Sequence, residues 1–562
     1  MRIIKAVLLA TVLLLVPGYT FASNLGFMRI SFIEGDIQVK TPEAGDWGPA
    51  SINGPLAEGD QIWVPEGGRV ELQLNTGSFI RLDQYSSLQV LSMDKESSQF
   101  YLSQGYAYIF YAAQRGSVIQ VDTPDASTRS YDRGIFRIDM SDQYTDVSVY
   151  NGYVETENRL GTTRINAGDL LAIGQNTKGE VAPIGSPDEW ERWNKTRNER
   201  NLARKDMSYR YLPDELRGYS SDFDNNGRWV QVPDFGYCWT PKVVAYADWA
   251  PYRHGRWIWR GGEYVWVGNE PWGWAPYHYG RWAFVTGVGW CWVPPAWGEV
   301  YWGPGYVGWV RTGDYVAWVP LAPRETYYGR GNYGLHSVNI TNVNITRINV
   351  TNVYKNVYVN NGVTVVNRNT FNTASPTRVN VHQNIVQQNI FVKNNFRVGG
   401  PEIKPSKGSY FGSDKHIETA KLPPQHVRDL SVRQLKESRP YTKEPGKSVL
   451  NPGHRPATLP VNKVATPRTL HEGKPAIRQL QPAEKGRPDV APAPRGERPQ
   501  AKPAEKGRPE VAPVPRGEKP HVQPAEKGKP DVSPAPKSEK KPAESDEGQK
   551  RLPKQKLEER DR

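Results

Sequence analysis

Short runs of alternating apolar and polar residues dominate the chain from residue 27 to residue 175. Arg69–Leu74 and Asp146–Tyr150 show this alternation, and Gly-Asp, Gly-Ser and Asn-Gly pairs separate the runs. Successive side chains of a strand point to opposite faces, so this period indicates strands with one buried face. The pattern predicts an all-β domain of many short strands, which we place at residues 23–178.

The period becomes helical after Ser186. Ser186, Pro187 and Glu189 supply an N-cap, a proline in the first turn and an acidic residue at the third helical position. Trp190 and Trp193 follow at helical spacing. We therefore predict one amphipathic helix within a linker of residues 186–212.

Tryptophan recurs at regular intervals further along the chain. Fifteen of the 19 tryptophans lie between residues 229 and 318, and a unit of about 26 residues repeats four times. Turn-forming residues separate the two tryptophans of each unit, so we predict four β-hairpins with Trp on both arms, within residues 213–330. The two interleaved series are Trp229, Trp257, Trp282, Trp309 and Trp239, Trp266, Trp292, Trp318.

The tryptophan array has two interpretations. The rings could form the core of hairpins that hold few aliphatic residues, since one Trp buries roughly 150–250 Å². Alternatively, one ring per unit could be exposed and stack on sugar rings of a glycan or of peptidoglycan, with repetition adding avidity. We favour the core, because so many exposed indoles would promote aggregation. A stacking surface would use Trp257, Trp259, Trp272, Trp274, Trp282, Arg256, Arg281 and His278.

Strand geometry and local chemistry add expectations for these residues. Residues two apart on a strand share a face, so the pairs Trp257/Trp259, Trp272/Trp274 and Trp290/Trp292 should point together. The arginine of each Gly-Arg-Trp motif is expected to stack on an indole. His278 is expected to be a structural hydrogen-bonding residue.

The C-terminal third of the chain changes in composition. Val and Ile recur among Asn and Thr in residues 335–398, which favours a β-ribbon. From residue 400 onward there is no Trp, and 27 of the 47 prolines lie there. So little apolar surface cannot offset the entropy of the chain, so we predict a disordered, basic, Pro-rich tail over residues 400–562.

The positive charge is confined to that tail. The whole chain has a net charge of +13, and residues 401–562 hold 35 Lys plus Arg against 22 Asp plus Glu, also +13. The remaining 37 basic and 37 acidic residues cancel, so the folded part lacks the excess that a nucleic-acid groove requires. A cationic tail suits anionic envelope polymers instead.

The N-terminus indicates the cellular compartment of the protein, and the compartment determines whether its cysteines can form a disulfide. Residues 1–22 read as a secretory signal peptide: Arg2 and Lys5, a short apolar core, and a small residue at Ala22. We expect a periplasmic or extracellular protein that is not integral to a membrane. Cys238 and Cys291 occupy equivalent repeat positions, and the sequence leaves open whether they form a disulfide.

Two stretches resemble known families. Glu34–Asp36, Gly67–Val70, Gly77–Leu82 and Gly134–Ile138 together resemble the FecR domain, which implies a β-solenoid or roll-like domain that makes protein contacts. The string Trp274–Trp282 resembles a Trp-rich family of unknown function that commonly follows FecR-like domains in secreted bacterial proteins. Signalling members of the FecR family have a cytoplasmic segment and a transmembrane helix before this domain, which we do not expect here.

No catalytic motif is present: the chain has no Gly-x-Ser-x-Gly, no His-Glu-x-x-His, no P-loop and no dinucleotide fingerprint. We expect a mainly β, modular, non-enzymatic envelope protein without cofactor or metal, which acts as an interaction scaffold for an envelope protein or glycan. The alternatives are a carbohydrate- or peptidoglycan-binding module and an accessory component of a sensory pathway.

Overall fold

The computed structural model describes residues 26–94, 97–141, 144–203, 207–242, 249–311, 314–340, 354–373, 396–397 and 400–441. The predicted signal peptide, residues 442–562 of the predicted tail, and most of the Asn-rich segment lie outside the described residues.

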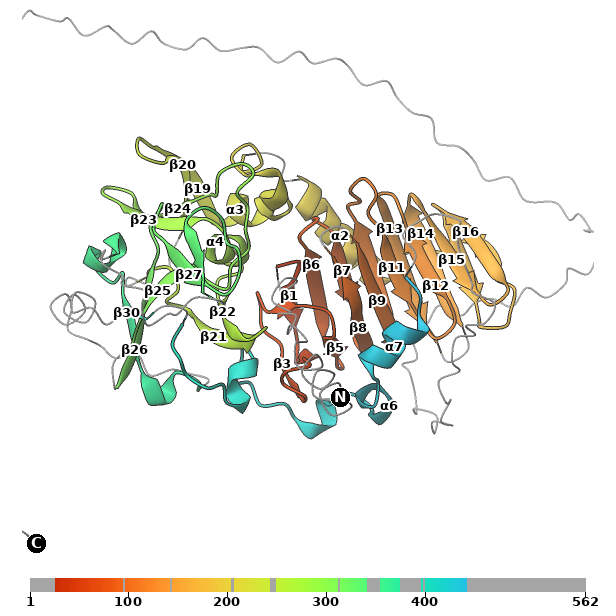
Figure 1. Cartoon of the computed structure of the whole chain (residues 1–562). Coiled ribbons are helices and arrows are strands. Elements are labelled where there is room, and N and C mark those ends of the chain that lie inside the picture. The colour runs from red at the N-terminus through yellow and green to blue at the C-terminus, as the bar shows by residue number, and fades with distance from the viewer. Residues whose placement is uncertain are drawn as a thin grey trace, which may run out of the picture. The chain divides into compact units, whose positions relative to one another are not determined.

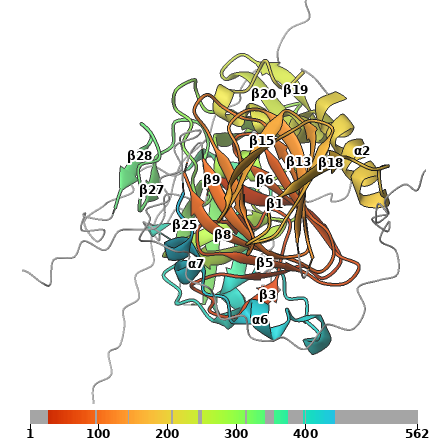
Figure 2. The same cartoon turned by 90° about the vertical axis from the view of Figure 1, so that its right-hand side faces the viewer.

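The N-terminal domain consists of two nine-stranded sheets that enclose one apolar core (Figures 1 and 2). The first sheet has the order β18-β17-β14-β13-β10-β7-β6-β1-β4 and the second the order β16-β15-β12-β11-β9-β8-β5-β2-β3. Neighbouring strands pair antiparallel except β9 and β11, which are parallel. This arrangement confirms a mainly β domain of many short strands.

The strand bounds follow the alternating runs of the sequence. The first sheet contains β1 (Met28–Glu34), β4 (Pro55–Leu56), β6 (Arg69–Leu74), β7 (Phe79–Leu82), β10 (Tyr106–Tyr111), β13 (Gly134–Met140), β14 (Thr145–Asn151), β17 (Asp169–Ile173) and β18 (Glu180–Pro183). The second contains β2 (Gln38–Lys40), β3 (Trp47–Pro49), β5 (Gln61–Val64), β8 (Ser86–Met93), β9 (Ser98–Gln104), β11 (Ile119–Asp122), β12 (Ser127–Ser130), β15 (Tyr153–Asn158) and β16 (Gly161–Asn166).

One helix, α2 (Glu189–Ala203), packs on the outer face of the first sheet. Its Trp190 is buried and packs edge-on against Tyr108 of β10, with ring centroids 6.1 Å apart. The helix begins later than predicted: Asp188, not Ser186, caps it, because the Asp188 carboxylate accepts the Glu191 backbone N–H at 2.7 Å.

A buried ion cluster holds this helix on the sheet. The Glu71 carboxylate on β6 accepts from Arg81 on β7 at 2.6 Å and from Arg197 of α2 at 3.0 Å. Burial alone would raise the pKa of Glu71, but attraction to the two guanidinium groups outweighs it and lowers the pKa to about 2. The carboxylate is therefore charged at every physiological pH.

Four β-hairpins follow, as predicted: β19 (Gly227–Val232) with β20 (Gly236–Pro241), β21 (Gly255–Arg260) with β22 (Glu263–Gly268), β23 (Arg281–Val285) with β24 (Gly289–Val293), and β25 (Val307–Arg311) with β26 (Tyr315–Pro320). In every hairpin the two series tryptophans are direct cross-strand partners: Trp229 with Trp239, Trp257 with Trp266, Trp282 with Trp292, and Trp309 with Trp318.

The hairpins do not pair in simple succession. The first and third join into one sheet, β19-β20-β24-β23, through the pair Trp239 and Trp292, whereas the second remains two-stranded. Short helices lie before and between them: η2 (Asp214–Tyr219), α3 (Ser220–Asn226) and α4 (Trp274–His278).

The predicted β-ribbon contributes edge strands instead of a separate ribbon, as far as its described residues show. Strands β29 (Thr364–Asn367) and β30 (Phe396–Arg397) flank the fourth hairpin in the order β29-β26-β25-β30. Strand β28 (Ser337–Asn339) pairs parallel with β27 (Tyr327–Gly329). Two single turns accompany them, η4 (Lys355–Tyr358) and η5 (Arg368–Thr370).

Residues 400–441 were predicted to be disordered, and for them that prediction is wrong. They form η6 (Lys407–Tyr410), η7 (Thr419–Lys421), α6 (Gln425–Arg428) and α7 (Val432–Ser438). The first part, through η6, contacts the second hairpin, and the remainder runs across the second sheet of the N-terminal domain (Figures 1 and 2). We call residues 400–441 the strap. Phe411, Val427 and Leu435 are its buried apolar side chains.

The ion cluster under α2 yields a stability prediction. Glu71→Gln should destabilise the fold by about 3–5 kcal/mol, because Arg81 would remain buried without its counter-charge. Urea unfolding would measure this change. Glu199→Gln, on the exposed side of the same helix, is the matched control and should change stability by less than about 0.5 kcal/mol. Equal effects of the two substitutions would contradict the role given to the cluster.

Candidate functional site

The glycine of the Gly-Arg-Trp motif lies beneath the second tryptophan of its own hairpin. A Cβ atom at Gly227 would lie 2.2 Å from the ring of Trp239, and one at Gly280 would lie 2.8 Å from Trp292. In the second hairpin, a Cβ at Gly255 would lie 2.7 Å from Trp266. The glycine is therefore required for the ring to pack, which explains why the motif repeats.

The residues proposed for a stacking surface lie in or against the core. Trp257, Trp272, Trp274 and Trp282 are at most 6% exposed, Arg256 is 7% exposed and His278 is 1% exposed. Trp259 and Arg281 are half-buried. Trp257, Trp272, Trp274 and Trp282 therefore have no free face for a sugar, which favours the core interpretation for these four rings. Trp259 is partly accessible and lines a small cavity.

The indole N–H groups of this core donate mainly to the protein backbone. Trp239 donates to the Phe223 carbonyl at 3.0 Å, Trp282 to Pro276 at 2.9 Å, Trp292 to Tyr279 at 2.8 Å and Trp318 to Tyr252 at 2.8 Å. A buried Trp usually has such an acceptor, and these bonds fix the orientation of the four rings. The buried Nε1 atoms of Trp257 and Trp266 have no hydrogen-bond partner.

Two of the three expected pairs share a face. Trp257 and Trp259 lie two apart on β21, and Trp290 and Trp292 lie two apart on β24, so each pair shares a face of its strand. Trp274 is different because it lies in α4 and not in a strand, so the two-residue rule does not apply to it and Trp272.

The arginines of the motif have other partners than indoles. The Arg281 guanidinium lies over the ring of Tyr306, 3.9 Å from its centroid, so the partner is a tyrosine. Arg256 donates to the carbonyl of Gly408 in the strap at 2.7 Å. Arg228 is exposed.

His278 is a structural residue in the core. Its Nδ1 lies 2.7 Å from the Gly303 carbonyl, and its ring stacks on Trp302 at a centroid distance of 5.2 Å. Burial lowers the pKa of His278 to about 4 despite that hydrogen bond. The ring is therefore neutral at physiological pH.

The two cysteines are free thiols that lie in one apolar cluster with Val232. Because Trp239 and Trp292 are Cα partners, the adjacent residues Cys238 and Cys291 are diagonal neighbours and not directly opposed. Burial raises the pKa of Cys238 to about 12 and that of Cys291 to about 11. Both thiols are protonated and poorly nucleophilic at neutral pH.

A small aromatic cavity lies beside the second and fourth hairpins. Its volume is about 100 Å³, and Trp259, Tyr264, Glu263 and Arg330 are among the residues that line it. Burial raises the pKa of Glu263 to about 7, although a hydrogen bond from Tyr333 opposes this. Ligand pockets usually measure about 300–1,000 Å³, so this cavity could hold a small polar group at most.

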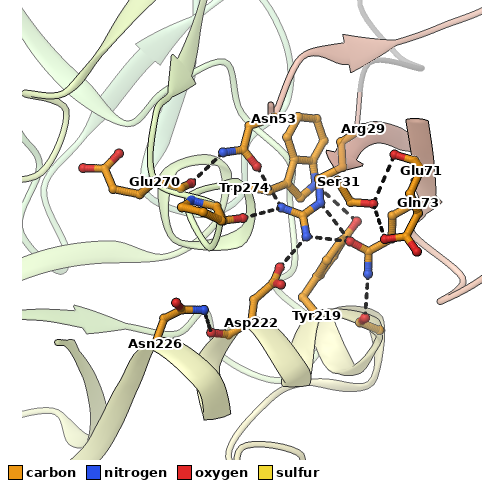
Figure 3. Close-up of polar contacts among 12 residues, drawn as sticks. Arg29, Ser31, Asn53, Glu71, Gln73, Tyr219, Asp222, Asn226, Glu270 and Trp274 are labelled. Carbon is orange, nitrogen blue, oxygen red and sulfur yellow. Dashed lines mark hydrogen bonds and ion pairs between the residues drawn. The ribbon is translucent and has the colours of Figure 1, made fainter. Parts of the chain in front are cut away.

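A buried arginine joins the N-terminal domain to the hairpin domain (Figure 3). Arg29 of β1 is 2% exposed and bonds Gln73 and Asn53 within its own domain, both at 2.8 Å. Across the boundary it bonds the Asp222 carboxylate of α3 and the carbonyl of Pro271. Its positive charge is thus balanced only when the two domains are in contact.

A second buried pair crosses the same boundary. Arg260, at the end of β21, donates to both carboxylate oxygens of Asp60 at 2.9 and 3.1 Å, and both residues are buried. Asn53 adds amide bonds to the carbonyls of Gly268 and Glu270 at 3.0 and 2.7 Å. Sequence reasoning missed these residues, because Arg29 and Asp60 look like ordinary polar positions of an alternating strand and a turn.

Two exposed aromatic side chains flank Arg217. Trp297 is 60% exposed and Tyr209 is 45% exposed. The Arg217 guanidinium lies 5.3 Å from the first ring and 4.4 Å from the second. Among the described tryptophans, Trp297 is the exposed one.

Two family profiles match these domains. The profile of the FecR protein family matches residues 60–155, from just before β5 into β15, and the family of unknown function DUF6600 matches residues 220–325, from α3 past β26. The chain carries a FecR domain followed by a DUF6600 domain. The order is the one that the two sequence resemblances predicted.

Comparison with solved structures gives partial matches. Two crystal structures of a candidate anti-sigma factor from Parabacteroides distasonis ATCC 8503 align with 17% and 18% identity and a TM-score of 0.20. Each match covers 22% of this chain and 59% of that one. No curated protein matches the chain.

Within the described ranges, no helix is long and apolar enough to cross a membrane. The same part of the chain contains no group of three or more His, Cys, Asp or Glu side chains placed to hold a metal ion.

The glycine under each indole yields a packing prediction. Gly227→Ala should destabilise the DUF6600 domain by about 1–3 kcal/mol, because the added methyl meets the Trp239 ring. Gly227 is extended, with φ of −164°, so backbone strain does not contribute. Gly185→Ala is the control, since no atom lies within 4 Å of that added methyl. Chemical unfolding of both variants would test this, and equal stabilities would disprove the packing argument.

His278 predicts a pH dependence. Its pKa is about 4 in the folded chain and 6.5 when unperturbed, so the unfolded chain binds more protons between these values and stability falls as the pH decreases from 6.5 to 4. The stability difference between the wild type and His278→Asn should narrow by about 3 kcal/mol from pH 7 to pH 4. The exposed His336→Asn variant is the control, and as a surface substitution it should change stability by less than about 0.5 kcal/mol.

Proposed function

We propose that this protein is a non-enzymatic interaction scaffold of the bacterial envelope, exported by a signal peptide at residues 1–22. Its FecR and DUF6600 domains would present one composite surface to a protein partner. The FecR match supports a protein-contacting role linked to envelope signalling. The cationic end of the chain would add attraction to anionic envelope polymers.

The observation that carries this proposal is the pair of buried charged contacts between the two domains. Arg29 and Asp222, with Arg260 and Asp60, are charged groups that lose their partners if the domains separate. Separating such a pair leaves uncompensated charges, so the pairs favour one relative orientation. A fixed orientation is useful to a protein that must hold two surfaces in register for a partner.

The aromatic core supports the same proposal. The tryptophans that could have bound a glycan are used for packing, and the cavity beside them is too small for a sugar chain. The glycan alternative depends on one observation, the exposed Trp297 and Tyr209 on either side of Arg217. That group is the place where a sugar ring could stack.

Fractionation followed by cross-linking would test the proposal. The full chain should be found in the envelope fraction with Ser23 as its first residue, and cross-linking there should recover a defined protein partner. Trp297→Ala should recover that partner equally well, whereas Asp60→Ala with Asp222→Ala should recover less of it, because the two domains lose their fixed orientation.

Sedimentation with purified peptidoglycan is the parallel measurement. We expect no co-sedimentation of the wild type. Co-sedimentation that Trp297→Ala abolishes would replace the scaffold with the glycan-binding function, and a cytoplasmic location would disprove the envelope proposal.

A further inference from the structure

The outer face of the second FecR sheet carries an unusual set of buried polar side chains. Five glutamines on adjacent strands β2, β5, β8, β9 and β11 point away from the core and are at most 5% exposed. The outer face of a sheet normally faces water, so something must cover it. We call this set the glutamine face: Gln38, Gln61, Gln89, Gln99 and Gln120.

The strap covers the glutamine face, and three of the five glutamines donate to its main chain. Gln38 and the indole of Trp63 both donate to the carbonyl of Lys421. Gln99 donates to the Arg439 carbonyl at 3.1 Å and Gln120 to the Pro440 carbonyl at 3.3 Å. Carbonyl oxygens are common to all peptides, so these contacts recognise a peptide backbone and not particular side chains.

Two aliphatic side chains anchor the strap eight residues apart. Val427 is fully buried against Trp47 and Trp63. Leu435, from α7, is buried against Leu91 and Tyr101. The strap has no core of its own, so its apolar burial comes from these two contacts and from Phe411, which packs against Gly48 of β3.

Charges at the rim complement the strap. Lys421 pairs with Asp36, and Lys436 pairs with Glu58. The side chains of both lysines remain 39% and 45% exposed, so these pairs guide orientation more than they add stability. The face therefore favours a segment with lysines near its aliphatic anchors.

The strap does not satisfy every polar group of the face. The side-chain carbonyl oxygens of Gln38, Gln61 and Gln89 are buried without a hydrogen-bond donor. A buried acceptor left without a donor costs free energy, so a segment that offers N–H groups at these positions would bind better than the strap does. Because the strap belongs to the same chain, its tether raises its local concentration at the face and favours its binding over that of a free segment.

From these contacts we propose that the glutamine face is a peptide-binding surface, and that the strap occupies it as a resident ligand. Its external ligand is a segment of another protein that carries two aliphatic residues about eight positions apart with flanking lysines, the pattern of the strap itself. This inference rests on the proposed scaffold function and names the chemistry of the partner.

Peptide binding to the full chain tests the proposal without an envelope partner, so its failure would not be confused with failure of the scaffold function. The probe is a fluorescein-labelled synthetic peptide of residues 413–441, followed by fluorescence anisotropy. The full chain with Val427→Asp and Leu435→Asp should bind this peptide at least about tenfold more tightly than the wild type, whose own strap competes.

Two controls keep the test decisive. In the full chain with Lys421→Glu and Lys436→Glu, the new carboxylates are repelled by Asp36 and Glu58. This repulsion loosens the strap without changing its buried side chains, so this variant can be measured even if the first one fails to fold. A peptide that carries the two aspartates should bind neither variant. Adding Gln99→Ala and Gln120→Ala to a loosened chain should weaken binding of the normal peptide by about tenfold.

The opposing outcomes are equally clear. Failure of the normal peptide to bind either folded, loosened chain would overturn the proposal, as would equal binding of the aspartate peptide. Light scattering is the last measurement: a dimer formed by exchange of straps would assign the face to a second copy of this chain and would overturn the assignment to another protein.

Discussion

An indole ring that packs flat across a hairpin needs a neighbouring position without a side chain, and the DUF6600 domain depends on this steric requirement. Gly227, Gly255 and Gly280 meet it in three hairpins. The fourth hairpin has Val307 at the equivalent position, and there Trp318 packs instead near Trp257, at a centroid distance of 5.9 Å. The sequence motif weakens where the packing changes, so the recurrence of the motif follows from a packing requirement.

Aromatic packing within the DUF6600 domain does not by itself fix the position of that domain against the FecR domain. The buried charged pairs between the two domains do. A buried ion pair contributes little net stability, because desolvation offsets much of its Coulomb energy. Removing one partner is nevertheless strongly destabilising, because the other charge stays buried and unpaired. Arg29 is bonded from both domains at once, so one orientation satisfies it. The two kinds of contact thus have different roles. The indoles supply the buried apolar area of the DUF6600 domain, and the buried arginines favour one orientation of the FecR and DUF6600 domains.

The features that the sequence predicted are those that local spacing encodes. The hairpins were predictable because each Trp pair and its turn lie within about ten residues, and cross-strand pairing follows from the turn. The pairing of the first and third hairpins through Trp239 and Trp292 was not predictable, because no short-range sequence pattern specifies which strands pair two repeats apart. The same applies to Arg260 and Asp60, which lie 200 residues apart.

The order of the strap could not be predicted from the sequence for a different reason. Proline and charged residues surround isolated aliphatic residues such as Val427 and Leu435. This composition predicts disorder, because the isolated aliphatic residues cannot form a core by themselves. They are ordered because the FecR sheet already supplies Trp63 and Tyr101 on its outer face. Strand alternation likewise marks Gln99 and Gln120 as polar, but it cannot distinguish a residue that faces water from one that faces a peptide. A side-chain amide offers one donor and one acceptor group, as a peptide bond does, so a row of glutamines resembles the edge of another strand. A sheet that carries such a row on a flat face can therefore bind a chain there, in addition to pairing with strands at its edges.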